Sequence, residues 1–551
     1  MSVRRWDTAF DFVIGGSGIG GATAAIKADE EGMDVLVLEK SSKVGGVSAV
    51  SGGLLWVGNN HLQGGLGVED SAETVEEYLR YGAAGPIDDE LLEAFVRRAP
   101  EALEFLDEVA DVPWNLVADS PDYLHPKTPS ARPEGRKLEV APIRRSEVGD
   151  LADDLRLSPH FPVGVTLSEL KSWGGLGSYE EWDRELLEER TEEGFLTFGP
   201  GVMGHLLAEV DRRNIEVKTE TPIDGLVTED NRVVGVDART DEGTTTVRAR
   251  EGVLLAIGGY DWSQEKIERY EFVPEMESAA PPIVHGDHLD LTEGLSADVA
   301  IRTEEDRLPV TPAGVHVPGE QMEGVPLYRI LAATRGVPGS IVVNGTGDRF
   351  HNEAYWPDFI ANIGQIDVFE GDHRNWPCFF ILDQDHRDAY PVAGIEPGQD
   401  LSEHFGEKGD TLEALAGKLG IDPDGLVETV ETFNRNAEEG VDPKFHRGET
   451  TIETKFWGDP NHEPSANLAP ISTPPFYGFE LDIVGTGVPS AGLRIDGSAR
   501  VLDEEGRVIP GLYAAGNTAA YTDTGGSYDS GIAMARGMTY GFVSASHASR
   551  S

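Results

Sequence analysis

The sequence has one cysteine, few lysines and no long hydrophobic run. Cys378 is the single cysteine among 551 residues, which excludes an intrachain disulfide, cysteine-based zinc or iron–sulfur sites and a two-cysteine haem attachment motif. No apolar run reaches the roughly 18 residues that a membrane span needs. Arg4 and Arg5 could begin an export signal, but the apolar residues 10–14 run directly into glycines, which is typical of a first strand. We therefore expect a cytoplasmic protein without a membrane span.

Positive charge is also scarce. Ninety-eight acidic residues oppose 45 basic ones, of which only 12 are lysines, and the formal net charge is −53. Such a chain repels DNA, RNA and anionic membranes, so nucleic-acid binding is disfavoured. The acidic residues are spread along the whole length, a composition typical of halophilic proteins, in which molar salt shortens the Debye length to about 3 Å. The 39% hydrophobic content nevertheless predicts a folded protein with a sizeable core, divided into two domains, rather than a disordered acidic chain.

A strand, a glycine turn, a helix and a second strand are predicted near the N-terminus. The apolar residues 11–14 lead into Gly16-x-Gly18-x-x-Gly21, followed by small residues at helical spacing and a strand at 34–39 that ends on Glu39. Such glycines allow a tight turn and a close approach of the backbone to a pyrophosphate at the helix N-terminus. A carboxylate at the end of the second strand can accept hydrogen bonds from a ribose. The segment therefore predicts a dinucleotide-binding βαβ unit.

Two further segments favour FAD over NAD. Residues 41–53 form a loop of small residues, which lets a wide, flat ligand lie against the backbone. At the other end of the chain, a strand at 508–517 closes on glycine and is followed by the small-residue segment 525–531 and a helical pattern. Strands are also expected at 215–218, 225–227 and 252–259. A nucleotide-binding domain completed by a distant C-terminal strand and helix is the layout of flavoproteins that bind FAD in an extended form.

At these residues the chain resembles the flavoprotein group that contains fumarate reductases and 3-ketosteroid Δ1-dehydrogenases, and it is more similar to the latter. The resemblance is carried by SGGLLWVGNN at 51–60, PDY at 121–123, GSIVVNGTGDRFHNE at 339–353, PFY at 475–477 and the segment 492–517. It implies an α/β fold, in which a Rossmann-like FAD-binding domain with a parallel sheet comprises residues 1–267 and 466–551. An inserted α+β cap domain, residues 268–465, would bind the substrate. The proline-rich segments 272–282 and 459–475 fit linkers between these parts.

The resemblance also implies which residues bind the cofactor. No histidine lies between Val44 and Asn60, where covalent members of the group carry their FAD-linking histidine, so we expect noncovalent FAD. The 14 histidines show no metal-ligand clustering, and no metal is expected. The residues expected to bind FAD are Gly16, Gly18, Gly21, Glu39, Lys40, Gly46, Ser48, Ser51, Gly52, Gly53, Gly258, Gly516 and Asn517.

The reaction implied is the removal of a hydride and a proton from neighbouring carbons. Fumarate reductases use an arginine as the acid and cationic groups to clamp a dicarboxylate, but no Arg or Lys lies in residues 354–359. Tyr528 occupies a position where a carboxylate clamp would have Arg, and Arg536 is a weak candidate farther along. A neutral, apolar ketone is therefore favoured as the substrate.

Tyrosines are the expected catalytic groups. In ketosteroid dehydrogenases a tyrosine hydroxyl and a backbone N–H four residues later hold the ketone oxygen. Tyr528 and Gly531 offer such a pair at a spacing of three, which leaves Gly531 and Ile532 as alternatives for the N–H. Such donors stabilise the enolate that forms as the α-proton leaves. Tyr528 could otherwise be a core tyrosine bonded to a backbone carbonyl.

The expected base is Tyr355, two positions earlier than in the family pattern, unless it is only a pocket-lining aromatic. Because an unperturbed tyrosine has a pKa of about 10, it needs help near neutrality. The resemblance assigns that help to Tyr123, next to which His125 is either a proton relay or a surface residue.

The leading hypothesis is therefore an FAD-dependent dehydrogenase that desaturates a 3-ketosteroid or a smaller cyclic ketone, with an electron acceptor that the sequence does not identify. The alternatives are a fumarate- or enoate-type reductase and a flavin-binding protein without turnover.

Overall fold

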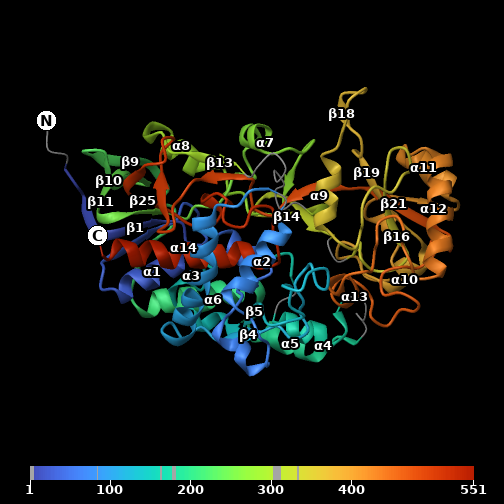
Figure 1. Ribbon diagram of the computed structural model, residues 1–551, viewed down its shortest axis with the longest axis horizontal. Coiled ribbons are helices and arrows are strands. Elements are labelled where there is room, and N and C mark those ends of the chain that lie inside the picture. The colour runs from blue at the N-terminus through green and yellow to red at the C-terminus, as the bar shows by residue number, and fades with distance from the viewer. Residues whose placement is uncertain are drawn as a thin grey trace.

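The fold is described from a computed structural model of residues 5–83, 85–161, 164–175, 181–301, 312–331 and 334–550. Figure 1 shows a larger part on the left, which contains the main sheet, and a smaller part on the right, around β16 (Ser340–Asn344), β19 (Cys378–Leu382) and β21 (Phe476–Glu480). The first strand, β1 (Thr8–Gly15), and the last helix, α14 (Ile532–Ala548), both lie in the larger part, so the chain leaves it for the right-hand part and returns.

The main sheet has a parallel core. Its strands lie in the order β24-β25-β11-β1-β2-β8, and all neighbours from β25 to β8 are parallel, whereas β24 is antiparallel at the edge. The strands are β1 (Thr8–Gly15), β2 (Val35–Leu38), β8 (Glu216–Lys218), β11 (Gly243–Leu255), β24 (Arg500–Leu502) and β25 (Val508–Ala514). The apolar run of β1 is almost wholly buried, as expected of a central parallel strand covered on both faces. The strands predicted from the N-terminal and C-terminal segments are thus confirmed.

A hairpin extends this sheet. Strands β9 (Ile223–Glu229) and β10 (Arg232–Thr240) are antiparallel to each other, and β10 pairs with the first half of β11. The second half of β11 pairs instead with β25, so one strand of 13 residues joins the hairpin to the parallel core.

Four long helices lie together below the main sheet in Figure 1: α1 (Ile19–Glu30), α3 (Asp89–Glu108), α6 (Phe198–Arg212) and α14 (Ile532–Ala548). Helices α1 and α14 pack closely, because a Cβ on Gly541 would lie 2.2 Å from the carbonyl oxygen of Gly20. Only glycine permits this approach. The crossing brings the N-terminal end of α14, and the loop before it, close to the glycine turn at the start of α1.

A small sheet of order β3-β5-β4 lies beside the N-terminal end of α14. Its strands are β3 (Leu55–Trp56), β4 (Trp114–Leu116) and β5 (Lys137–Val140), and β5 pairs antiparallel with both neighbours. Trp56 lies opposite Lys137 in this pairing. The other elements of this region are α2 (Ala72–Gly82), β6 (Ile143–Arg144), α4 (Leu167–Ser172), α5 (Arg184–Glu192) and β7 (Phe195–Leu196).

The right-hand part has its own antiparallel sheet and apolar core. Strands β16 (Ser340–Asn344), β19 (Cys378–Leu382), β21 (Phe476–Glu480) and β20 (Glu407–Gly409) lie in this order, and helices α11 (Leu412–Leu419) and α12 (Pro423–Glu438) cover the sheet. The buried cluster between them includes Ile341, Val343, Phe379, Ile381, Leu415, Leu426, Val430 and Phe433. This part is called the cap below.

A fourth sheet, in the order β12-β22-β14-β15, contains β14, which lies between the main sheet and the cap in Figure 1. Its strands are β12 (Glu277–Ser278), β14 (Ala313–Met322), β15 (Val325–Ile330) and β22 (Asp482–Gly485). The remaining elements are α7 (Gln264–Tyr270), α8 (Asp287–Thr292), β13 (Val299–Ile301), α9 (Pro357–Ile363), β17 (Ile366–Asp367), β18 (Asp372–His373), α10 (Gln384–Ala389), α13 (Thr451–Lys455) and β23 (Ala491–Leu493).

The domain ranges 1–267, 268–465 and 466–551 stay a prediction. Strand pairing shows that β21 and β22, which follow residue 465, belong to sheets with strands from the range 268–465. In the ranges described, no helix is both long and apolar enough to cross a membrane.

Candidate active site

One long cavity runs from the glycine turn before α1 to the loop before α14. Its volume is about 390 Å³, within the range usual for ligand sites. Twelve of the thirteen residues predicted to bind FAD line it, and Gly21 is the exception. Those twelve are Gly16, Gly18, Glu39, Lys40, Gly46, Ser48, Ser51, Gly52, Gly53, Gly258, Gly516 and Asn517.

The glycine turn leaves no room for side chains. A Cβ on Gly16 would lie 2.3 Å from the carbonyl oxygen of Ala256, and Gly16 has a φ of +92°. A Cβ on Gly21 would lie 1.9 Å from the carbonyl oxygen of Gly16, so Gly21 permits the close packing of helix and strand behind the cavity. Gly18 precedes α1 and faces the cavity. The N-terminal end of α1 is therefore open to a negatively charged group.

Glu39 lies at the end of β2, as predicted. Its carboxylate is buried and accepts hydrogen bonds from the Ser17 amide at 3.1 Å, the Ser17 hydroxyl at 2.7 Å and the Ser41 amide at 2.9 Å. Neighbouring Lys40 forms an ion pair with Asp287, with 2.6 Å between Nζ and Oδ2. These contacts fix the carboxylate at the cavity wall.

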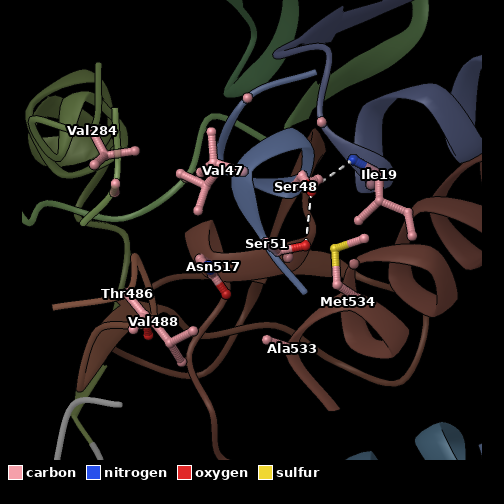
Figure 2. A pocket seen from close by; sticks show the side chains of 18 of the residues that line it. Ile19, Val47, Ser48, Ser51, Val284, Thr486, Val488, Asn517, Ala533 and Met534 are labelled. Atoms are coloured by element: carbon pink, nitrogen blue, oxygen red, sulfur yellow. Dashed lines mark hydrogen bonds between the residues drawn. The ribbon is translucent and has the colours of Figure 1, made fainter. Parts of the chain in front are cut away.

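The small-residue loop 45–53 forms another wall of the cavity. Figure 2 shows Ser48 accepting from the backbone amide of Ile19, at 3.1 Å, and Ser51 donating to the carbonyl oxygen of Ser48, at 2.8 Å. The hydroxyl of Ser51 also accepts from the Gly53 amide. The loop is thus tied to the first turn of α1 and to itself, without a large side chain between its backbone and the cavity.

The C-terminal segment closes the cavity from the opposite side. Figure 2 shows Thr486, Val488, Asn517, Ala533 and Met534 there. The Asn517 amide nitrogen donates to the carbonyl oxygen of Gly487 at 2.6 Å, and its oxygen accepts from the Tyr521 hydroxyl at 2.6 Å. Gly258 and Gly516, both with positive φ, line the cavity at the ends of β11 and β25.

The three predicted catalytic tyrosines lie in one aromatic cluster. Tyr123, Tyr355 and Tyr528 come from three distant segments, and they pack with Trp356, Phe456, Trp457 and Tyr521. The ring centres of Tyr123 and Tyr355 are 6.3 Å apart, and those of Trp356 and Tyr528 are 5.7 Å apart. Tyr528 and Trp356 line the cavity, whereas Tyr123 and Tyr355 are not among its lining residues. Tyr123 and Tyr355 thus form a layer behind the wall.

The hydroxyl of Tyr123 reaches the wall through two neighbours. It accepts a hydrogen bond from the indole Nε1 of Trp356 at 3.2 Å, and it is hydrogen-bonded to the hydroxyl of Ser530. Both Trp356 and Ser530 line the cavity.

The loop before α14 places Gly531 and Ile532 differently. The Ile532 amide donates to the carbonyl oxygen of Asp529 at 3.1 Å, and Ile532 does not line the cavity. Gly531 does line it. It has a φ of +106°, and a Cβ there would lie 2.5 Å from the backbone of Leu55 and Trp56. Gly531 is therefore the better candidate for the N–H donor beside Tyr528.

Comparison with known proteins matches residues 11–531 to the FAD binding domain family. The chain belongs to this family. It is 33% identical to the 4-oxocyclohexanecarboxylate 2-dehydrogenase of Sinomonas cyclohexanicum, over 97% of this chain and 92% of that protein. It is 32% identical to a 3-oxosteroid 1-dehydrogenase of Mycobacterium tuberculosis, over 98% of both chains.

A solved structure supports the same assignment. The 3-ketosteroid Δ1-dehydrogenase of Sterolibacterium denitrificans, in complex with 1,4-androstadiene-3,17-dione, matches with a TM-score of 0.90 and 30% identity, over 98% of this chain and all of that one. A flavocytochrome c3 fumarate reductase shares the fold at a TM-score of 0.66 and 20% identity, over 99% of this chain and 79% of that one. The chain is an FAD-dependent dehydrogenase of the ketosteroid dehydrogenase type.

The cavity of this flavoprotein fits FAD by two observations. A side chain on Gly16 would collide with the backbone, and a Cβ on Gly18 would lie 3.3 Å from the Ser48 hydroxyl, so bare backbone faces the place where a pyrophosphate would lie. The cavity then continues without a break from Glu39 to Gly531. FAD, when bound, would supply the acceptor for the hydride and its two electrons.

Burial controls the protonation of the two inner tyrosines. It raises the pKa of Tyr355 well above the usual value, and the carboxylates of Asp529, Glu453 and Asp358 raise it further. Burial and Asp529 likewise raise the pKa of Tyr123, while the hydrogen bonds with Ser530 and Trp356 oppose this rise. Both hydroxyls are therefore protonated near neutral pH.

Arg536, a weak candidate for binding a substrate carboxylate, is already paired with other side chains. Its guanidinium is fully buried, forms an ion pair with Asp523 at 2.7 Å and stacks on the ring of Tyr521 at 3.7 Å. Arg536 does not line the cavity. His125 is half-buried, and its Nδ1 lies 2.9 Å from the hydroxyl of Thr451.

Sequence reasoning did not single out four polar residues around the tyrosines, namely Tyr78, Lys137, Asp529 and Ser530. Asp529 and Ser530 lie inside the segment 525–531, which carries Tyr528 and Gly531, so their position in the sequence could have identified them as site residues. Tyr78 and Lys137 lie in α2 and β5, far from every motif, and only the fold brings them to the site.

Proposed function

We propose that this dehydrogenase removes two hydrogens from neighbouring carbons beside the ketone of an apolar cyclic substrate, either a 3-ketosteroid or a smaller cyclic ketone. The observation that carries the proposal is the pair of donors at one end of the FAD cavity. The Tyr528 side chain and the Gly531 backbone lie on the same wall, in front of the Tyr123 and Tyr355 layer. The relatives named for 3-oxosteroids and for 4-oxocyclohexanecarboxylate support a cyclic ketone as the substrate.

The lining of the cavity supports an uncharged ketone. Around Tyr528 the wall consists of Trp356, Phe456, Val488 and Ala533. Among the described lining residues the basic side chains are Lys40, which is paired with Asp287, and His160, whose Nε2 lies 3.0 Å from the carbonyl oxygen of Ala279. A carboxylate on the substrate would find no unpaired lysine or arginine among the described residues of this wall.

Each residue has a distinct task in the proposed reaction. The Tyr528 hydroxyl and the Gly531 amide would donate to the ketone oxygen and stabilise the enolate that develops there. Tyr355, whose side chain is only partly buried, would accept the α-proton, and the aromatic wall would exclude water from the reacting carbons. The N-terminal end of α14, next to Gly531, adds a favourable partial positive charge near the oxygen.

The substitution Tyr528→Phe tests the proposal. It removes one donor to the developing oxyanion and keeps the ring, so turnover should fall by about 10²–10³, with little change in FAD content or melting temperature. The assay pairs an artificial electron acceptor with 4-androstene-3,17-dione, and with 4-oxocyclohexanecarboxylate beside its uncharged methyl ester, of which the ester should be turned over better. A control anaerobic assay with fumarate and reduced viologen should show no activity. Full turnover of Tyr528→Phe, or reduction of fumarate by the wild type, would refute the proposal.

We also propose that FAD is held noncovalently. The absence of a histidine between Val44 and Asn60 supports this, so acid precipitation should leave the flavin in the supernatant. The variant Gly18→Ala places a methyl group at the open end of α1, 3.3 Å from the Ser48 hydroxyl. It should lower FAD content, whereas Gly417→Ala in α11, where a Cβ would meet nothing within 4 Å, should not. Flavin that stays with the denatured chain would contradict the noncovalent part.

A further inference from the structure

A buried ion pair lies directly beneath the loop that carries Tyr528. The Lys137 Nζ is 2.8 Å from Oδ1 of Asp529, and the two side chains are 1% and 0% exposed. Lys137 comes from β5 of the small sheet, and Asp529 stands between Tyr528 and Ser530. The pair therefore connects the small sheet to the wall of the cavity.

Asp529 is held by two further segments. Its Oδ2 accepts a hydrogen bond from the hydroxyl of Tyr78, in α2, and another from the backbone amide of Tyr123 at 3.0 Å. Three segments thus converge on one carboxylate. Because the flanking residues Tyr528 and Ser530 cannot move far while Asp529 is fixed, these contacts set the position of the loop.

Lys137 also contacts the segment that carries Tyr123. Its ammonium group donates to the carbonyl oxygen of Pro121 at 2.5 Å and lies 4.7 Å from the ring centre of Tyr123. An ammonium group over an aromatic face is attracted to it, which favours one position of the ring. The same lysine thus orients both the loop 525–531 and the tyrosine behind it.

Stability alone does not account for this pair. The loss of hydration of two buried charges offsets much of their attraction, and an apolar pair of similar size is often as stable. The directional contacts to Tyr78, Tyr123 and Pro121 add what an apolar pair would lack, namely a fixed geometry.

We propose that Asp529, held by Lys137, is a positioning residue that places the Tyr528 hydroxyl and the Gly531 amide for the ketone oxygen. This inference rests on the proposed function. Gly531 follows Asp529 by two residues, and the hydrogen bond from the Ile532 amide to the Asp529 carbonyl closes the turn between them. Neither Asp529 nor Lys137 lines the cavity, so both would act through their neighbours.

The first test is Asp529→Asn in the FAD-loaded enzyme. Asparagine keeps the size and can accept from Tyr78 and Tyr123, but it lacks the charge that holds Lys137. A displacement of about 1 Å at a reacting group can cost about 10²-fold in rate, so kcat should fall by up to that factor while FAD content is kept. The matched control is Asp442→Asn in the cap, which removes a carboxylate 2.8 Å from the buried Arg349. It should lower the melting temperature and leave kcat unchanged.

A double variant without the two charges separates a loss of loop positioning from the destabilisation caused by an unpaired buried charge. Asp529→Asn with Lys137→Met leaves no unpaired buried charge, so the melting temperature should recover relative to either single variant. Under the proposal kcat stays low, because the ion pair that ties the loop to β5 is still missing. Recovery of kcat together with the melting temperature would overturn the proposal.

A double-mutant cycle with Tyr528→Phe supplies a readout that a purely structural role would not move. If Asp529 acts through Tyr528, Asp529→Asn should cost much less in kcat when Tyr528→Phe is already present. Equal costs in both backgrounds would overturn the proposal. If Tyr528→Phe itself has full turnover, the proposed function fails. If Tyr528→Phe is impaired and Asp529→Asn is not, only the positioning role fails.

Discussion

The indole Nε1 of Trp356 lies 3.2 Å from the hydroxyl oxygen of Tyr123 and donates a hydrogen bond to it. Trp356 lines the cavity, and Tyr123 lies behind the wall with a side chain that is 1% exposed. The tryptophan therefore links a buried tyrosine to the place where the substrate would lie. A hydrogen bond to the oxygen also lowers the pKa of that hydroxyl, against the effect of burial.

The substitution Trp356→Phe should reduce turnover by roughly twofold to tenfold, the effect of losing one hydrogen bond worth roughly 0.5–1.5 kcal/mol. The aromatic wall is kept, so FAD content should not change. Trp457→Phe is the matched control, because Trp457 packs on the Tyr123 ring at 4.9 Å and no hydrogen bond joins it to the Tyr123 hydroxyl among the described residues. Equal losses in the two variants would show that only ring packing matters.

The proposed base, Tyr355, predicts an alkaline rise in activity. Only the deprotonated form accepts a proton, and burial together with the nearby carboxylates raises the pKa of Tyr355 above its usual value. The deprotonated fraction therefore grows about tenfold per pH unit up to that raised pKa, so kcat should still be increasing at pH 9. Tyr355→Phe should lower kcat by about 10²–10⁴, the usual effect of losing general base catalysis, and should abolish this rise. Unchanged turnover would assign the base to another group.

The cofactor half of this site could be predicted from the sequence, and the proton-transfer half only in part. Gly16, Gly18 and Glu39 act through local geometry, in a strand, turn and strand that follow one another in the chain, so spacing alone locates them. Tyr123, Tyr355 and Tyr528 could be named from motifs, but their layering behind Trp356 depends on how three segments pack.

The ion pair between Lys137 and Asp529 could not be predicted from the sequence. Lys137 lies in a four-residue strand in which every residue is buried, and a lysine there gives no pattern that distinguishes it from a surface strand. Its partner is identified only when β5 and the loop 525–531 are brought together. Likewise, β21 pairs with β19 because the chain contributes one more strand to the cap after residue 465. The prolines at 474 and 475 indicate a linker there and give no sign of this strand pairing.

The backbone at Gly531 predicts a sharp effect of one methyl group. Gly531→Ala places a Cβ 2.5 Å from the backbone of β3 in a residue with a φ of +106°, so the loop must move. Turnover should fall by about 10² or more. Gly506→Ala is the matched control, since Gly506 also has a positive φ, +75°, but a Cβ there meets nothing within 4 Å. Both variants carry backbone strain, and only Gly531→Ala should lose turnover; a similar loss in both would remove the argument for close contact at Gly531.

The net charge of −53 predicts that stability rises with salt. Like charges on the surface repel one another over about 10 Å at 0.1 M ionic strength and over about 3 Å at 1 M, so added salt relieves a repulsion that the unfolded chain feels less. The buried Lys137–Asp529 pair is 1% and 0% exposed and is screened much less, so salt should raise the melting temperature without weakening the site. Melting in 0.1 M and 3 M KCl measures the first effect, and kcat at the two concentrations measures the second.

Tetramethylammonium chloride at equal ionic strength provides the control, because it gives the same screening with a cation that carboxylates bind poorly. Stabilisation by both salts indicates screening, stabilisation by KCl alone indicates bound potassium, and equal melting temperatures in 0.1 M and 3 M KCl would contradict the prediction.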